Sequence, residues 1–211
     1  MLKNKVGIRG WQAFIKRTFD LAGSIIGLIL TGWLIALAYV VSTIDTGKSG
    51  FFIQERVGMN GRIFKLIKIR TMRERNDIKT NVTTRSDPRI TKLGALFRRY
   101  KIDELPQLIN IILGHMSFVG PRPDVPGFAD KLKANDRVIL SVRPGITGPA
   151  TLKYRDEEEI LASKENPEEY NQKIIFPDKV RINKNYVENY RLRDDFYYIW
   201  ATIFGTKVRR K

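Results

Sequence analysis

An uncharged run from Leu21 to Ile44 places the strongest constraint on what this chain can fold into. As a helix, its 24 residues would extend about 36 Å at 1.5 Å per residue. A bilayer core is about 30 Å thick, so the run is long enough to cross it. A buried core helix is the alternative, but such helices rarely stay uncharged over this length. A cleaved signal peptide fits less well, because Ala36-Leu37-Ala38 lies inside the run and not after it.

Basic residues flank this run on both sides. The five that precede it are Lys3, Lys5, Arg9, Lys16 and Arg17, and the rest of the chain's 38 Lys and Arg follow it. Basic flanks prefer the cytoplasmic side of a membrane, whereas a simple crossing would place one flank outside. A re-entrant hairpin keeps both flanks inside and sets the charged part of the chain against anionic head groups.

A re-entrant hairpin has to break near its middle. Thr31-Gly32 lies close to the centre of the run, and glycine weakens a helix there. We therefore expect a re-entrant membrane helix broken at Gly32, which enters and leaves on the cytoplasmic side. The chain then divides into residues 1–44, a basic segment with the membrane helix, and residues 45–211, a cytosolic domain.

The second part is typical of one small mixed α/β domain. Asn60-Gly61 is a strong turn signal between two Phe- and Ile-rich segments, 51–56 and 62–70, and predicts a β-hairpin. The polar residues 73–91 read as a loop. The spacing of Leu93, Leu96, Phe97 and Tyr100 predicts a helix.

Further elements follow along the chain. We predict a second helix over residues 105–113, ending at Gly114. Residues 156–179 are charged and predict an irregular segment over the active face. Near the end, five apolar residues fall on one helical face and four basic residues follow. This pattern fits an interfacial helix as well as a core helix; the residues are Phe196, Ile199, Trp200, Ile203, Phe204, Lys207, Arg209, Arg210 and Lys211.

The composition of the chain limits the classes of partner that it is expected to bind. The chain has 38 Lys and Arg against 22 Asp and Glu, a net charge of +16, which favours an anionic partner such as nucleic acid, a membrane surface or a phosphorylated substrate. No nucleic-acid-binding motif is present. The absence of cysteine excludes disulfides and thiolate zinc sites.

Asp103-Glu104-Leu105-Pro106 stands at the start of the second predicted helix. Simple capping explains it, since Asp is a favoured N-cap and Pro is tolerated in the first turn. A functional interpretation uses the same place, because a helix N-terminus attracts phosphate and keeps a carboxylate ionised. Adjacent carboxylates can also share a Mg²⁺ ion with phosphate oxygens. Arg98 lies upstream, where it could hold a phosphate.

Six ordered blocks resemble those of the bacterial sugar transferases, the monotopic phosphoglycosyl transferases. They extend from about residue 16 to residue 148 and read Lys16-Arg17-Thr18-Phe19-Asp20, Gln54-Glu55-Arg56-Val57-Gly58, Phe64 to Met72, Asp103 to Leu108, Met116 to Pro123, and Arg143 to Gly148. One departure concerns the membrane helix, because the Ser-Pro break of many relatives aligns here with Gly32-Trp33.

The resemblance implies a function. Members lie at the cytoplasmic face of the bacterial inner membrane, where they transfer a sugar 1-phosphate from a UDP-sugar to polyprenyl phosphate, release UMP and need Mg²⁺. By this resemblance, residues 45–211 are expected to be the catalytic domain. Asp103 matches the nucleophile and Glu104 its partner near the metal. The residues that match substrate-binding positions, or are weaker candidates for them, are Arg98, Pro121, Arg122, Pro123, Lys68, Arg70 and Arg143. The expected partners are a UDP-sugar, undecaprenyl phosphate and membrane lipids, with no nucleic acid; monomer and homodimer both stay open. The alternatives are a non-catalytic membrane-surface scaffold and a nucleic-acid-binding protein.

Overall fold

The computed structural model describes residue 8 and residues 10–74 and 87–205. The basic residues expected at Lys3, Lys5 and Arg9 and from Lys207 onward lie outside these ranges, as does most of the predicted loop. The helices and strands are α1 Gly10–Thr46, β1 Phe51–Val57, β2 Ile63–Ile69, α2 Lys92–Arg99, α3 Gln107–Ile112, β3 Ser117–Val119, β4 Gly145–Thr147, α4 Pro149–Lys153, α5 Glu157–Ala162, α6 Pro167–Tyr170, α7 Phe176–Glu188 and α8 Leu192–Phe204.

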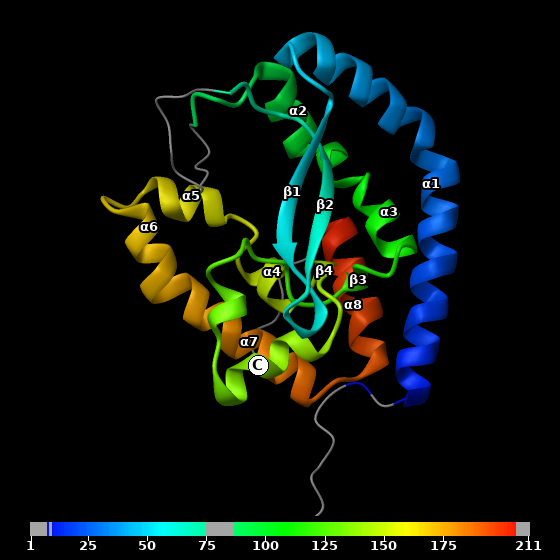
Figure 1. Cartoon of the computed structure of the whole chain (residues 1–211), viewed down its shortest axis with the longest axis vertical. Coiled ribbons are helices and arrows are strands. Elements are labelled where there is room, and N and C mark those ends of the chain that lie inside the picture. Colours follow the sequence, from blue (N-terminus) through cyan, green and yellow to red (C-terminus); the bar gives the residue numbers. More distant parts are fainter. Residues whose placement is uncertain (1–7, 9, 75–86, 206–211) are drawn as a thin grey trace, which may run out of the picture.

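The apolar run forms most of a single helix, α1, which continues without interruption through Gly32. The expected break at Thr31-Gly32 was therefore wrong. The helix instead curves along one side of the molecule and over its top (Figure 1). Four hydroxyls in α1 donate to carbonyls one turn earlier, among them Ser24 to Asp20 at 2.6 Å and Thr31 to Gly27 at 2.7 Å. Such side-chain bonds compete with the helical ladder and bend helices.

The outer face of α1 is apolar and largely uncovered. In its most apolar window only 17% of the residues are buried, and by length and composition the helix could cross a membrane. Ile29 and Ile44 are 75% and 79% exposed. The core helix of a soluble domain would cover such side chains, so this exposure favours a membrane-embedded helix.

The inner face of α1 is built from small residues. A Cβ on Gly23 would lie 2.9 Å from the Phe118 ring, and one on Gly27 would lie 3.1 Å from Leu108 of α3. Gly32 has nothing within 4 Å of its Cβ position. Gly23 and Gly27 are one turn apart, and this spacing lets two backbones approach closely. The same face therefore sets α1 directly against α3.

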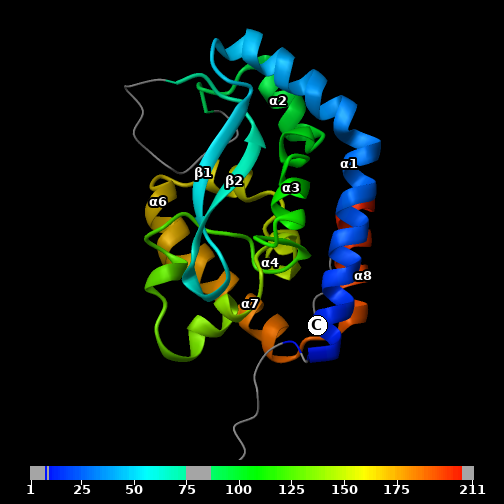
Figure 2. The same cartoon turned by 45° about the vertical axis from the view of Figure 1, so that its right-hand side comes forward.

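Both ends of α1 are fastened to the rest of the chain. Near the N-terminal end, the Lys16 ammonium lies 2.6 Å from the Asp195 carboxylate of α8, and both groups are buried. Near the C-terminal end, Ser42 donates to the Arg70 carbonyl at 2.5 Å. Figure 2 shows α1 and α8 running side by side on the same edge of the molecule.

The predicted hairpin is confirmed. Strands β1 and β2 pair antiparallel, with Phe51 opposite Ile69. Asn60 and Gly61 adopt positive φ angles of 59° and 78°, as the Asn-Gly signal requires. Asn110 of α3 joins the free edge of β2, donating to the Lys65 carbonyl at 2.7 Å and accepting from Ile67 N–H at 3.0 Å.

The helix predictions had mixed outcomes. The spacing around Phe97 is confirmed as α2, whereas the second helix begins at Gln107 and not at residue 105. A 3-10 turn over Ile102–Glu104 precedes it. The prediction of an irregular segment after residue 156 was wrong. These residues fold into α5, α6, a π-helical stretch Asn171–Ile175 and the start of α7. β3 and β4 form a short parallel pair.

Helix α8 leaves part of its apolar face uncovered, whereas Ile199 packs against the core. Phe196, Trp200 and Phe204 are between 50% and 60% exposed, and the Trp200 and Phe204 rings stack at 4.0 Å between centroids. A core-packing helix would bury this face. The exposure therefore favours the interfacial interpretation of the C-terminal helix.

Candidate active site

Asp103 and Glu104 share the 3-10 turn between α2 and α3. Lys101 has a left-handed backbone (φ 58°), which reverses the chain after α2 and starts the turn. Both carboxylates are buried, with 7% and 9% of each residue exposed. Two adjacent buried carboxylates are costly unless cations or ligands stabilise them.

The capping interpretation of Asp103 was wrong. Pro106 occupies the N-cap position of α3, and no side chain caps that helix. The Oδ1 atom of Asp103 is buried and has no hydrogen-bond partner among the described residues. Buried carboxylate oxygens are nearly always bonded, so this unpaired atom is a candidate for contact with a ligand or a water molecule.

Glu104 is held by two cations from distant parts of the chain. Its Oε1 accepts a hydrogen bond from Arg122 Nη2 at 2.6 Å and lies 3.4 Å from Lys68 Nζ. Lys68 comes from β2, and Arg122 from the irregular segment after β3. The fold thus gathers both of these predicted site residues around the dyad.

Arg98, at the end of α2, forms an ion pair with Glu158 of α5. The positive charge of Arg98 also acts on Asp103, where it opposes the rise in the pKa that burial causes. The segment after residue 156 therefore does reach the site's edge, as expected, although it is helical.

The pKa values of the two carboxyl groups are shifted in opposite directions. Burial, followed by the charge of Glu104, raises the pKa of Asp103, and the nearby Lys68, Arg98 and Lys101 offset this only in part. Burial would also raise the pKa of Glu104, but Arg122 and then Lys68 outweigh it, so that pKa lies well below its usual range. The helix N-terminus was expected to favour the ionised form of Asp103; in the structure burial has the larger effect on its pKa and acts in the opposite direction.

Comparison with known proteins decides the family. Residues 11–209 match the family described as bacterial sugar transferase. The chain is 33% identical over 212 residues to the exopolysaccharide production protein ExoY of Sinorhizobium fredii (strain NBRC 101917 / NGR234), covering 93% of this chain and 87% of ExoY. This chain belongs to the bacterial sugar transferase family.

Two other relatives of this sugar transferase are named for lipid-carrier chemistry. The undecaprenyl-phosphate glucose phosphotransferase of Komagataeibacter xylinus is 38% identical over 150 residues, covering 67% of this chain and 28% of that protein. The UDP-galactose-lipid carrier transferase of Erwinia amylovora is 32% identical over 215 residues, covering 93% and 41%. Such names, with the uncovered apolar face of α1, indicate that the transferase associates with a membrane.

The fold does not bring every predicted site residue of the transferase to the dyad. Arg143 Nε donates to the Gly114 carbonyl at 2.8 Å, at the opposite end of α3 from Asp103. Arg70 Nε donates to the Ser49 carbonyl at 2.8 Å, in the connection between α1 and β1. Pro121 and Pro123 flank Arg122 and are buried. Arg143 contacts a backbone carbonyl, and Arg70 also pairs with Glu74 at 3.6 Å and lies over the Phe52 ring, so their predicted role in substrate binding gains no support.

Sequence reasoning missed two residues that shape this site. Asn110 docks α3 on β2, and Arg56 of β1 donates to the Pro123 carbonyl at 3.0 Å. Arg56 lies within one of the motif blocks, which was the available signal, but its partner is 67 residues away.

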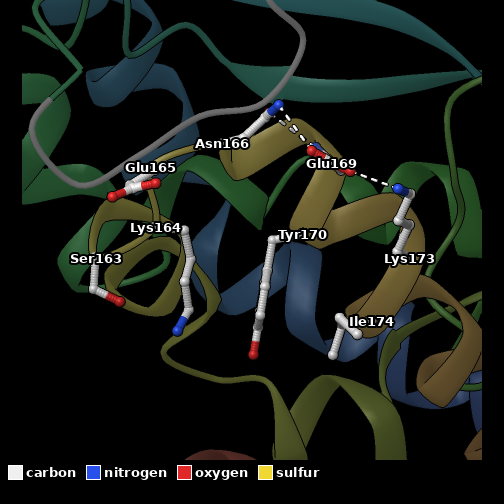
Figure 3. Close-up of a pocket in the computed structure, with 8 residues that line it drawn as sticks. All are labelled: Ser163, Lys164, Glu165, Asn166, Glu169, Tyr170, Lys173 and Ile174. Atoms are coloured by element: carbon white, nitrogen blue, oxygen red, sulfur yellow. Dashed lines mark hydrogen bonds and ion pairs between the residues drawn. The ribbon is translucent and has the colours of Figure 1, made fainter.

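An open hollow of about 460 Å³ lies elsewhere, where α5 turns into α6. Figure 3 shows Lys164, Tyr170 and Ile174 pointing the same way along it. Lys164 Nζ lies 4.6 Å from the Tyr170 ring. The rim of this hollow is exposed, and neither Asp103 nor Glu104 lines it. The hollow is therefore separate from the site described above.

Proposed function

We propose that this protein transfers a sugar 1-phosphate from a UDP-sugar to undecaprenyl phosphate, with Asp103 as the nucleophile, at the cytoplasmic face of a bacterial inner membrane. The observation that carries the proposal is the buried Asp103 whose Oδ1 has no partner, beside a Glu104 already neutralised by Arg122. The names of the relatives support a nucleotide sugar as donor and a lipid carrier as acceptor.

The chemistry proceeds in two displacements at one phosphorus atom. A carboxylate oxygen of Asp103 attacks the phosphorus that carries the sugar, and the bond from that phosphorus to the bridging oxygen breaks. UMP leaves with the electron pair, and the sugar phosphate stays on Asp103. An oxygen of undecaprenyl phosphate then attacks the same phosphorus, which frees Asp103 and gives the lipid-linked diphosphate sugar.

The basic residues lower the cost of bringing anions together. The donor diphosphate, the lipid phosphate and Asp103 are all negative. Arg98 and Arg122 offer planar guanidinium groups for phosphate oxygens, and Lys68 adds a third charge. Arg98 exchanges its Glu158 partner for the donor in this scheme, while Pro121 and Pro123 line the approach to Arg122.

The donor set at the dyad fits a Mg²⁺ ion. Mg²⁺ takes oxygen ligands, often one or two carboxylates completed by waters and substrate phosphates. The unpaired Oδ1 of Asp103 and the carboxylate of Glu104 would hold it. No larger cluster of metal-ligating side chains occurs within the part of the chain that the structure describes. When bound, the ion would neutralise charge on the donor diphosphate.

An Asp103→Asn variant tests the proposal. It removes the attacking charge while nearly keeping the shape, so UMP release should fall by about a thousandfold or more. Incubation of the native protein with a UDP-sugar alone should release UMP and add a sugar phosphate to Asp103, detected by intact mass. A folded Asp103→Asn protein with near-normal turnover would show that Asp103 is not the nucleophile.

The same experiment separates the alternatives. Direct attack by the lipid phosphate predicts no adduct and no UMP until lipid is added. A non-catalytic scaffold predicts no UMP release under any condition, over a panel of UDP-sugars with undecaprenyl phosphate and Mg²⁺. The panel also identifies the sugar.

A further inference from the structure

Arg56 occupies an unusual place on β1. Its guanidinium lies largely buried between two acceptors, donating from Nη1 to the Pro123 carbonyl at 3.0 Å and from Nη2 to Gln54 Oε1 at 2.6 Å. One contact fixes the guanidinium to its own strand, and the other fixes a distant loop to that guanidinium. A planar fork suits this task, because its donors point in fixed directions.

The same loop is held at further points. The N–H of Val57, the next residue on β1, donates to the Asp124 carbonyl at 2.9 Å. At the loop's other end, Gly145 N–H donates to the Pro121 carbonyl at 2.9 Å. Between these fixed points stands Arg122, whose side chain reaches Glu104.

A second guanidinium lies close to Arg122 here. Burial, and next the neighbouring charge of Arg122, lower the pKa of Arg56 to about 10, and the negative charges of Asp124 and Glu104 offset this only in part. The two like charges repel each other, which works against this placement. The hydrogen bonds to Pro123 and Gln54 are direct contacts that hold the guanidinium in place against this repulsion.

We propose that Arg56 is a positioning residue that acts through Arg122. By holding the Pro123 carbonyl, it fixes the backbone from which Arg122 reaches Glu104, and so keeps the charge of that guanidinium beside the dyad. The catalytic part of this inference rests on the proposed function, whereas its structural part does not.

Arg56→Lys is the variant that isolates this role. It keeps the positive charge, but one ammonium cannot reproduce the two directed bonds of the fork. Lys65→Gln on β2 is the matched control, because Lys65 has an exposed side chain on the same hairpin. Gln54→Met removes the acceptor and tests the contact from the other side.

The first measurement is the guanidinium N–H signal of Arg122, followed by ¹⁵N NMR of arginine-labelled protein and assigned with Arg122→Gln. In the native protein and in Lys65→Gln, the Nη protons that are bonded to Glu104 should be resolved and slow to exchange with water. In Arg56→Lys they should broaden and exchange faster, because Arg122 is no longer held against Glu104. This readout needs no turnover.

The second measurement is UMP release in a double-mutant cycle with Arg122→Gln. Arg56→Lys alone should slow release by about tenfold to a hundredfold, the effect of a misplaced site group. In the Arg122→Gln background it should cause no further loss, because the residue it acts through is gone.

Two results would overturn the inference. One is an Arg122 guanidinium spectrum in Arg56→Lys that matches the native protein; the other is a full additional loss of UMP release in the Arg122→Gln background. If Arg56→Lys does not fold, Gln54→Met takes its place in both measurements. Absence of UMP release from the native protein would refute the proposed function, while the Arg122 spectrum would still decide the role of Arg56.

Discussion

Asp103 and Glu104 are neighbours in one turn, yet their surroundings give them different chemistry. Glu104 has Arg122 and Lys68 against it and stays charged, whereas Asp103 keeps an unpaired oxygen and a raised pKa. A carboxylate already neutralised by hydrogen-bonded cations is a poor nucleophile. The less stabilised Asp103 is the more reactive of the two, which agrees with the proposed division of roles.

This asymmetry predicts a pH dependence. Asp103 attacks only when it is ionised, and its pKa is raised. As the pH is lowered, adduct formation should therefore be lost at a higher pH than it would be with an ordinary aspartate. Glu104→Gln removes the negative neighbour, which lowers the pKa of Asp103 and moves this acid limb to lower pH. Residual adduct formation under saturating Mg²⁺, followed by intact mass across the acid range, measures it.

Glu165→Gln is the control for this experiment, since it makes the same charge change on an exposed turn between α5 and α6. An acid limb that stays in place, or moves upward, in Glu104→Gln would contradict the electrostatic coupling of the pair.

The dyad could be predicted from sequence because its motif is contiguous. Its electrostatics could not, since Lys68 and Arg122 join Glu104 only after β2 and the loop after β3 come together. The direction of the Asp103 pKa was missed for a related reason: burial is a property of the packed domain, and no local pattern around Asp103 reports it.

Among the elements, α3 links the membrane helix to the site. Gly23 and Gly27 let α1 approach closely, and Leu108 of α3 fills the space beside Gly27. The turn with Asp103 directly precedes α3. A change on the inner face of α1 should therefore reach the dyad through α3.

Gly27→Val should push α1 away from Leu108. Its branched side chain would enter a space where even a Cβ lies 3.1 Å from that residue. We expect a loss of about 1–3 kcal/mol in the free energy of unfolding, the usual cost of overpacking. Denaturant unfolding in detergent micelles measures it. Gly32→Val, in open space, should change stability by less than about 0.5 kcal/mol.

Equal effects at Gly27 and Gly32 would show that the contact between α1 and α3 is not selective. A drop in UMP release in Gly27→Val, with none in Gly32→Val, would show in addition that the packing of α1 against α3 affects the active site.

The elements that sequence predicted well have local causes. The hairpin follows from Asn60-Gly61 between two apolar segments, and α2 from the spacing around Phe97. The helices after residue 156 were missed because charged residues there hide any apolar period, and their order depends on partners such as the Glu158 pair with Arg98. The continuous α1 was missed because packing against the domain, and not Gly32, shapes it.

At the scale of the whole molecule, the two fastened ends of α1 constrain topology. Lys16 binds α8, and Ser42 binds the end of β2, so both ends belong to one charged domain. If that domain stays on one side of the membrane, both ends of α1 stay with it. The curve of α1, without a break, is then enough for re-entry.

Lys5→Cys and Lys48→Cys should therefore react from the same side. The native chain has no cysteine, so each variant carries a single label site. A membrane-impermeant maleimide added to intact cells should label neither, and both should be labelled after permeabilisation. Labelling of only one flank in intact cells would establish a full crossing.

The pair between Lys16 and Asp195 also sets an order of events during synthesis. The two residues are 179 positions apart, and at about 5–20 residues per second a ribosome needs roughly 10–40 s to make the chain between them. For most of that time α1 has been synthesised while the Lys16 ammonium lacks its carboxylate. Until α8 emerges, Lys16 has to be stabilised by its surroundings and not by Asp195, so α1 reaches its final position in the fold only when α8 arrives.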